Sequence, residues 1–62
     1  MCEAHAFIIE DGVEKKILSD VDIVEFKGDE IILKNIFGEQ QILKNVEFKS
    51  YNNSKRKLIF KK

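Results

Sequence analysis

The chain has one cysteine, one histidine and no apolar run approaching the roughly 18 residues that a transmembrane helix needs. A single cysteine cannot form an internal disulfide. The first residues contain neither a basic segment nor an apolar segment, so we expect no signal peptide. Because a lone cysteine without a secretion signal is typical of a reducing compartment, we expect a cytoplasmic protein.

Most catalytic motifs are also missing. There is no Cys-x-x-Cys pair, no second histidine and no glycine-rich phosphate loop. The acidic residues cluster at turn positions, where solvated carboxylates are expected. The 62 residues form one domain, residues 1–62, with little room for the deep cleft of a multi-step enzyme. We therefore expect a protein that is not an enzyme.

Because the chain is small, a metal or a partner subunit could contribute to its stability. A chain of this length buries only about 60% of the surface that its unfolded form exposes. Such chains often gain stability from a disulfide, a metal or oligomerisation. Apolar residues make up 44% and charged residues 35%, which is typical of a soluble globular protein. Without a disulfide, a metal or self-association remains.

The apolar residues favour strands. Nine Ile, four Val and five Phe outnumber two Ala and four Leu, and β-branched and aromatic side chains suit a pleated sheet. Seven short segments alternate with turn residues. We predict an all-β fold, a small antiparallel β-barrel or sandwich of about six to seven short strands. The expected strands are Glu3–Ile9, Val13–Leu18, Val21–Lys27, Glu30–Asn35, Gln40–Asn45, Val46–Tyr51 and Lys55–Phe60.

Turn residues separate these segments. Asp11-Gly12 is a strong hairpin signal, because glycine accepts the positive φ that tight turns require. Gly28-Asp29 has the composition of a second two-residue turn, and Ser19-Asp20 is expected to separate two strands. Asn52-Asn53-Ser54 suits a slightly longer turn.

The net charge of zero hides an uneven distribution. Residues 1–41 carry four basic and ten acidic residues, a net charge of −6, whereas residues 42–62 carry seven basic residues and one acidic residue, a net charge of +6. Halves of opposite sign can mark an interaction tail. They can equally pair as neighbouring strands, and this second interpretation is favoured.

Cys2 is the first candidate for chemistry. It lies beside Met1 rather than within an apolar strand, and its thiolate could serve redox chemistry or bind a soft metal. If Met1 is removed, the thiolate, the α-amine and backbone nitrogens could form a planar ligand set for Ni(II) or Cu(II). A sulfur-rich site needs a second chain, which a two-fold dimer would supply. From the residues alone, an incidental role for Cys2 is the favoured interpretation.

His5 is the second candidate ligand, since imidazole binds Ni, Zn and Cu. Residues three apart on an ideal strand face opposite sides. Cys2 and His5 of one chain can therefore meet only across a dimer or at an irregular terminus, and an ordinary strand role for His5 is the favoured interpretation.

The basic end has its own alternative function. Cationic side chains near Phe48 and Tyr51 could follow a phosphate backbone while the aromatic rings stack on bases. Lysines on a terminal strand also protect a sheet edge from aggregation, which is the favoured interpretation. The candidate RNA-binding residues are Lys55, Arg56, Lys57, Lys61 and Lys62.

The whole chain resembles the CooT family of small nickel-binding accessory proteins. The resemblance depends on a series of short motifs in matching order: Met1-Cys2-Glu3-Ala4, Asp11-Gly12, Leu18-Ser19-Asp20-Val21, Gly28-Asp29 and Ile36-Phe37-Gly38-Glu39. Hydrogenase chaperones of the HypC type also begin Met-Cys, but they carry a Pro-Gly segment, and this chain has no proline.

The resemblance implies a β-barrel homodimer in which the cysteine after the initiator methionine binds nickel, a role that carries over to Cys2 alone. It also implies a function in the maturation of nickel-containing carbon monoxide dehydrogenase, although some members of the family were first catalogued as predicted RNA-binding proteins. His5 is outside the family pattern. We therefore expect Ni(II), or another soft or borderline divalent metal, at Cys2 of two chains, with Glu3, His5 or the terminal amine completing the site.

Overall fold

Six strands make up most of the protein in a computed structural model, which describes residues 4–62. Cys2 and Glu3 of the expected metal site lie outside the described residues. The strands are β1 (Ala4–Glu10), β2 (Val13–Lys27), β3 (Glu30–Asn35), β4 (Gln40–Lys44), β5 (Glu47–Asn52) and β6 (Lys57–Lys61). The all-β prediction is confirmed.

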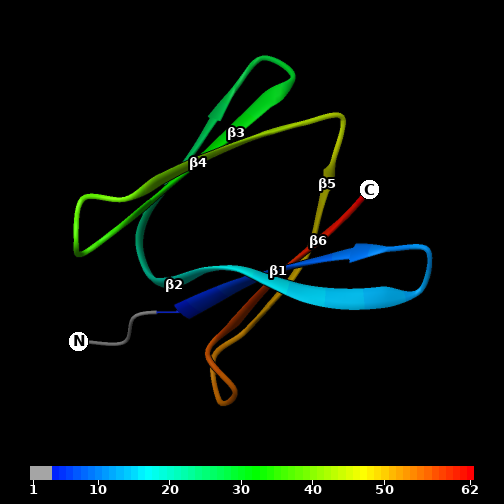
Figure 1. Ribbon diagram of the computed structural model, residues 1–62, viewed down its shortest axis with the longest axis horizontal. Coiled ribbons are helices and arrows are strands. Elements are labelled where there is room, and N and C mark those ends of the chain that lie inside the picture. The colour runs from blue at the N-terminus through cyan, green and yellow to red at the C-terminus, as the bar shows by residue number, and fades with distance from the viewer. Residues whose placement is uncertain (1–3) are drawn as a thin grey trace.

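The strands form one sheet in the order β4-β3-β2-β1-β6-β5 (Figure 1). Within residues 4–62 the sheet is not closed by hydrogen bonds, because β4 and β5 remain its two edges. Four of the five pairings are antiparallel, as expected, but β1 and β6 run parallel, with Ala6 opposite Leu58. The N-terminal strand therefore lies inside the sheet, between β2 and β6.

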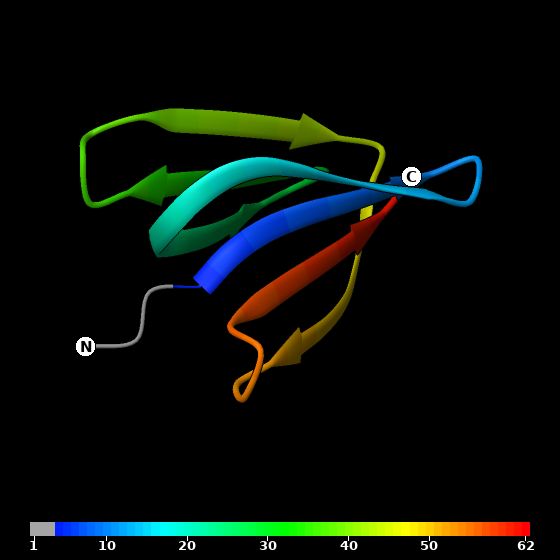
Figure 2. The ribbon, with the colours of Figure 1, turned by 60° about the horizontal axis from the view of Figure 1, so that its bottom comes forward.

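The long strand β2 connects two groups of strands, β1, β6 and β5 on one side of the sheet and β3 and β4 on the other. Its first half pairs with β1 and its second half pairs with β3, and Figure 2 shows it curving from one group to the other. The predicted turn at Ser19-Asp20 is wrong, since both residues lie within β2. Asp20 has a φ of 55° and the register shifts on both sides of it. These residues mark a bend, which uses the same polar residue types as a turn.

The two predicted glycine hairpins are confirmed. Asp11 and Gly12 both have positive φ, 53° and 76°, so they match the two central positions of a type I′ turn. Gly28-Asp29 joins β2 to β3, with Lys27 opposite Glu30.

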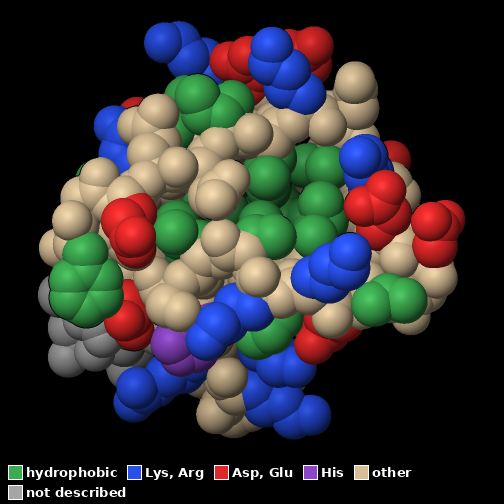
Figure 3. All heavy atoms as spheres, in the orientation of Figure 1, with side chains coloured by type: hydrophobic (Ala, Val, Ile, Leu, Met, Phe, Trp, Pro, Cys, Tyr) green, Lys and Arg blue, Asp and Glu red, His purple; other side chains and the backbone are tan. Residues whose placement is uncertain are grey.

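The core lies between the two groups of strands. Ala6, Leu33 and Phe60 have no exposed surface. The core residues of β1, β3 and β6 are alternate residues of their strands, as the period of two requires. Figure 3 shows apolar side chains filling the space that the ribbon of Figure 1 encloses. The core residues are Ala4, Ala6, Leu18, Val21, Ile31, Leu33, Leu43, Leu58 and Phe60.

Ion pairs join the two oppositely charged parts of the sequence. Lys57 lies 2.9 Å from Glu14 and Lys62 lies 3.5 Å from Glu10, so the basic last strand faces the acidic first hairpin. Lys44 and Glu30 make a third such pair at 3.3 Å. Lys62–Glu10 and Lys44–Glu30 fit the favoured interpretation of the charge distribution, pairing between neighbouring strands, whereas Lys57 reaches past β1 to Glu14 of β2.

Candidate functional site

Ala4, the first described residue, connects the expected metal ligands Cys2 and Glu3 to the sheet. Ala4 is 5% exposed, belongs to the core and pairs with Val21 of β2. Cys2 is two residues away along the chain. A ligand at Cys2 is therefore tethered to the start of the central strand β1.

His5 is the next residue, and two neighbouring segments hold it. Its backbone N–H donates to the carbonyl of Arg56 at 2.7 Å, and its Nδ1 accepts a hydrogen bond from the backbone N–H of Asp20 at 3.3 Å. The bend of β2 and the end of the β5–β6 turn thus meet at the start of β1. Figure 3 shows the histidine at the surface among Lys and Arg side chains.

The hydrogen bond to Nδ1 bears on the ligand chemistry of His5. A lone pair at Nδ1 that accepts a hydrogen bond places the proton of the neutral ring on Nε2. Histidines that bind metals through one nitrogen almost always donate the N–H of the other nitrogen to an acceptor. Here the group facing Nδ1 is itself a donor. Ligation through Nε2 would require the ring proton to move to Nδ1, at the expense of the contact with Asp20.

Residues 4–62 contain no group of three His, Cys, Asp or Glu side chains that could hold a metal ion. The predicted ligands Cys2 and Glu3 are not among these residues. The metal site thus stays a prediction.

The five basic residues of the RNA-binding alternative have different surroundings. The ammonium group of Lys57 lies 2.9 Å from Glu14 and 4.7 Å from the centre of the Phe7 ring, so it has both an ion pair and a cation–π contact. Lys62 pairs with Glu10. Lys55 and Arg56 lie in the turn before β6, and Lys61 is its last residue. RNA binding stays a prediction, with two of its five cations paired.

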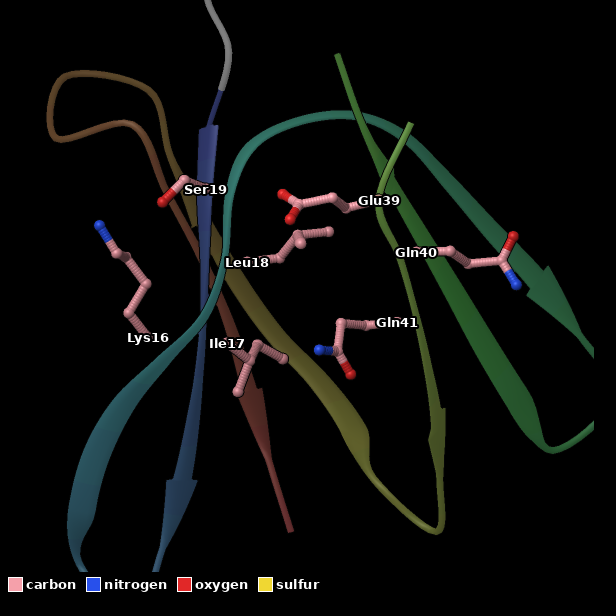
Figure 4. A pocket seen from close by; sticks show the side chains of 7 residues that line it. All are labelled: Lys16, Ile17, Leu18, Ser19, Glu39, Gln40 and Gln41. Atoms are coloured by element: carbon pink, nitrogen blue, oxygen red, sulfur yellow. The ribbon is translucent and has the colours of Figure 1, made fainter. Parts of the chain in front are cut away.

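An open groove of about 380 Å³ runs between the middle of β2 and the start of β4. Figure 4 shows Leu18, Glu39 and Gln41 turned toward it, whereas Lys16 and Ser19 point away from β4. These side chains offer one carboxylate and one amide beside an apolar wall. This set can form hydrogen bonds with a ligand, but it does not form a nucleophile–base pair.

Two residues that organise this side of the barrel were missed from the sequence. Asn35 is 6% exposed, and its side chain makes three hydrogen bonds to the β3–β4 turn. Asp20 was read as part of a turn, yet its backbone contacts both His5 and Ile36. The available signal was an Asn at a strand end followed three residues later by Gly38, a pattern typical of Asx-type turns.

Residues 4–62 form a small β-protein with an open sheet and with β1 between β2 and β6. A family model described as CO dehydrogenase accessory protein CooT matches residues 1–61. The chain therefore belongs to the CooT family of CO dehydrogenase accessory proteins.

A solved structure supports the same assignment. A crystal structure assigned to CooT from Carboxydothermus hydrogenoformans superposes with a TM-score of 0.89 at 26% sequence identity, covering 98% of this chain and 97% of the other. No curated protein matches the sequence. The resemblance stated from the motifs is confirmed.

Proposed function

We propose that this protein holds Ni(II) through Cys2 and supports the maturation of a carbon monoxide dehydrogenase. The observation that carries the proposal is the family match over residues 1–61, which includes Cys2. The nickel ion is cargo for the client enzyme, and the accessory protein performs no catalysis of its own. Thiolate sulfur suits nickel and other soft or borderline divalent metals.

The metal site is proposed to form between two chains. One chain offers a single thiolate, whereas a two-fold dimer offers two equivalent ones. Glu3, His5 or the terminal amine would complete the coordination. Ala4 is buried in the core, so the chain that follows each Cys2 is anchored in the sheet.

Nickel titration of wild type and Cys2→Ser, followed by calorimetry and by native mass measurement, tests the proposal. We expect one Ni(II) per two chains in the wild type and at least a hundredfold loss of affinity in Cys2→Ser. Ser54→Ala, a substitution in the β5–β6 turn, is the matched control and should bind like the wild type. Unchanged affinity and stoichiometry in Cys2→Ser would overturn the proposal. One nickel per chain would overturn the two-chain site.

A further inference from the structure

The turn between β3 and β4 displays two large apolar side chains. Phe37 is 70% exposed and Ile36 is 46% exposed, and neither belongs to the core cluster. Phe37 is the most exposed large apolar side chain among residues 4–62. Residues 36–39 are called the anchor loop below. Packing of the barrel does not account for an aromatic ring in this position.

Hydrogen bonds hold the anchor loop in one conformation. The side-chain oxygen of Asn35 accepts from the backbone N–H of Phe37 at 3.1 Å and of Glu39 at 2.8 Å, and its amide donates to the Glu39 carboxylate at 2.7 Å. The N–H of Ile36 donates to the carbonyl of Asp20 at 3.1 Å. Gly38 supplies a φ of +84°, which other residues adopt with strain.

Because the loop is ordered before binding, less free energy is lost when Phe37 contacts a partner. Binding loses free energy when loops and side chains become ordered at the interface. Exposed aromatic residues with few rotatable bonds, held in place before binding, are typical anchors of protein interfaces. The hydrogen bonds of buried Asn35 provide this order in the free protein.

Acidic residues lie in and beside the anchor loop. Glu39 lies within it, the backbone carbonyl of Asp20 accepts a hydrogen bond from the N–H of Ile36, and Asp22 is the extra residue where β2 bulges opposite Asn35 and Lys34. The charge of Lys34 is paired with Glu25 at 3.6 Å, and Lys16 points away from β4 on the far side of the groove. Figure 3 shows an apolar group with acidic side chains beside it at the end where Figure 1 places the β3–β4 turn.

We propose that Ile36 and Phe37 dock into an apolar pocket with a basic rim on the client carbon monoxide dehydrogenase. This inference rests on the proposed function, since it names the surface that meets the client. Asp20 contacts both His5 and Ile36, so the anchor loop lies next to the start of β1. Docking there would bring the client to the side of the barrel where β1, the strand that follows Cys2 in the sequence, begins.

The charge around the anchor loop favours a different protein, rather than a second copy of this chain, as its binding partner. A two-fold contact uses the same patch on both subunits, so acidic rim would face acidic rim. Like charges brought together in this way oppose association. A pocket with a basic rim gains attraction instead, and that attraction weakens as salt rises.

The test measures binding to immobilised nickel-free carbon monoxide dehydrogenase from the source organism. Wild type is compared with Phe37→Ala, Ile36→Ser and Asp22→Asn, and Val13→Ala serves as control, because Val13 is 53% exposed on the distant β1–β2 hairpin. We expect at least tenfold weaker binding for Phe37→Ala and Ile36→Ser, severalfold weaker binding for Asp22→Asn, and unchanged binding for Val13→Ala. Thermal midpoints and nickel affinities should stay at wild-type values.

The outcomes separate this inference from the proposed function. Equal client binding by wild type and Phe37→Ala overturns the docking surface, and so does an absence of wild-type binding. A change from dimer to monomer in Phe37→Ala, measured by sedimentation, also overturns it, since the loop would then serve self-association. Failure of the nickel proposal appears elsewhere, in the Cys2→Ser titration, and does not depend on Phe37.

Discussion

The ring of Phe48 meets the ring of Phe60 edge-on, with their centres 5.7 Å apart and their planes at 65°. Phe26 extends this row at 6.3 Å from Phe48. Phe26 lies in the second half of β2, whereas Phe48 and Phe60 lie in β5 and β6. The aromatic row therefore joins the two groups of strands where the sheet has no hydrogen-bonded closure.

Replacement of Phe48 by Ala should destabilise the fold, although its side chain is 44% exposed. We expect a loss of about 1–2 kcal/mol, because edge-to-face pairs add to the free energy of apolar burial. Replacement of the fully buried Phe60 by Ala should lower the free energy of unfolding by about 3–5 kcal/mol. Urea unfolding measures both, with Val13→Ala as the exposed control. Equal stability of Phe48→Ala and Val13→Ala would contradict the closure role.

His5→Asn and His5→Ala separate a structural role from a ligand role. The Asn oxygen can replace Nδ1 as acceptor of the Asp20 N–H, whereas Ala removes it. We expect His5→Asn to keep nickel affinity within about threefold, because the facing group is a donor, unlike the usual environment of a ligating histidine. His5→Ala should lose about 1 kcal/mol of stability. Calorimetry and urea unfolding measure the two quantities.

A tenfold loss of nickel affinity in His5→Asn would instead support His5 as a ligand. The thermal midpoint of the same variant is the control for folding. If affinity falls while the midpoint is unchanged, the imidazole itself contributes to the site.

Local sequence patterns predicted most of the strands, but they did not predict the contacts between residues that are distant in sequence. Alternation and the Asp11-Gly12 turn signal gave the first hairpin correctly. The sequence around Asp20 is equally typical of a bend and of a turn. The backbone of Asp20 forms hydrogen bonds with His5 and Ile36, which are distant in sequence, and these contacts favour the bend. The parallel pairing of β1 with β6 has no local signal either, since it joins residues about fifty positions apart. Tertiary contacts decided both features.

The candidate site was predictable in part for the same reason. Cys2 and His5 were found as rare residue types near the start of the chain. Nothing local shows that the bend of β2, the β3–β4 turn and the start of β1 lie together, and this arrangement gives Asn35 and Asp20 their importance.

The protein should bind single-stranded RNA weakly at physiological salt. Two cations of the basic end, Lys57 and Lys62, pair with Glu14 and Glu10, so RNA would have to displace these carboxylates. Fluorescence anisotropy with a labelled oligonucleotide over a salt series is the measurement. Tight binding that falls steeply with salt, and is lost when Lys55 and Arg56 are replaced by Gln, would restore the RNA-binding alternative.

Asn35→Ala should loosen the anchor loop and reduce stability by about 2–3 kcal/mol. The substitution removes three hydrogen bonds of a side chain that is 6% exposed. Asn52→Ala is the matched control, because Asn52 also accepts two hydrogen bonds, from the Lys55 N–H and the Ser54 hydroxyl, but is exposed. We expect it to cost less than about 1 kcal/mol.

Hydrogen exchange of the Phe37 and Glu39 amides provides the local measurement. Both N–H groups donate to Asn35, so their exchange should accelerate in Asn35→Ala more than that of amides in the β1–β2 hairpin. Uniform acceleration across the barrel would mean that Asn35 stabilises the whole fold rather than the loop. Faster exchange confined to the loop, together with weaker client binding, would show that loop order contributes to docking.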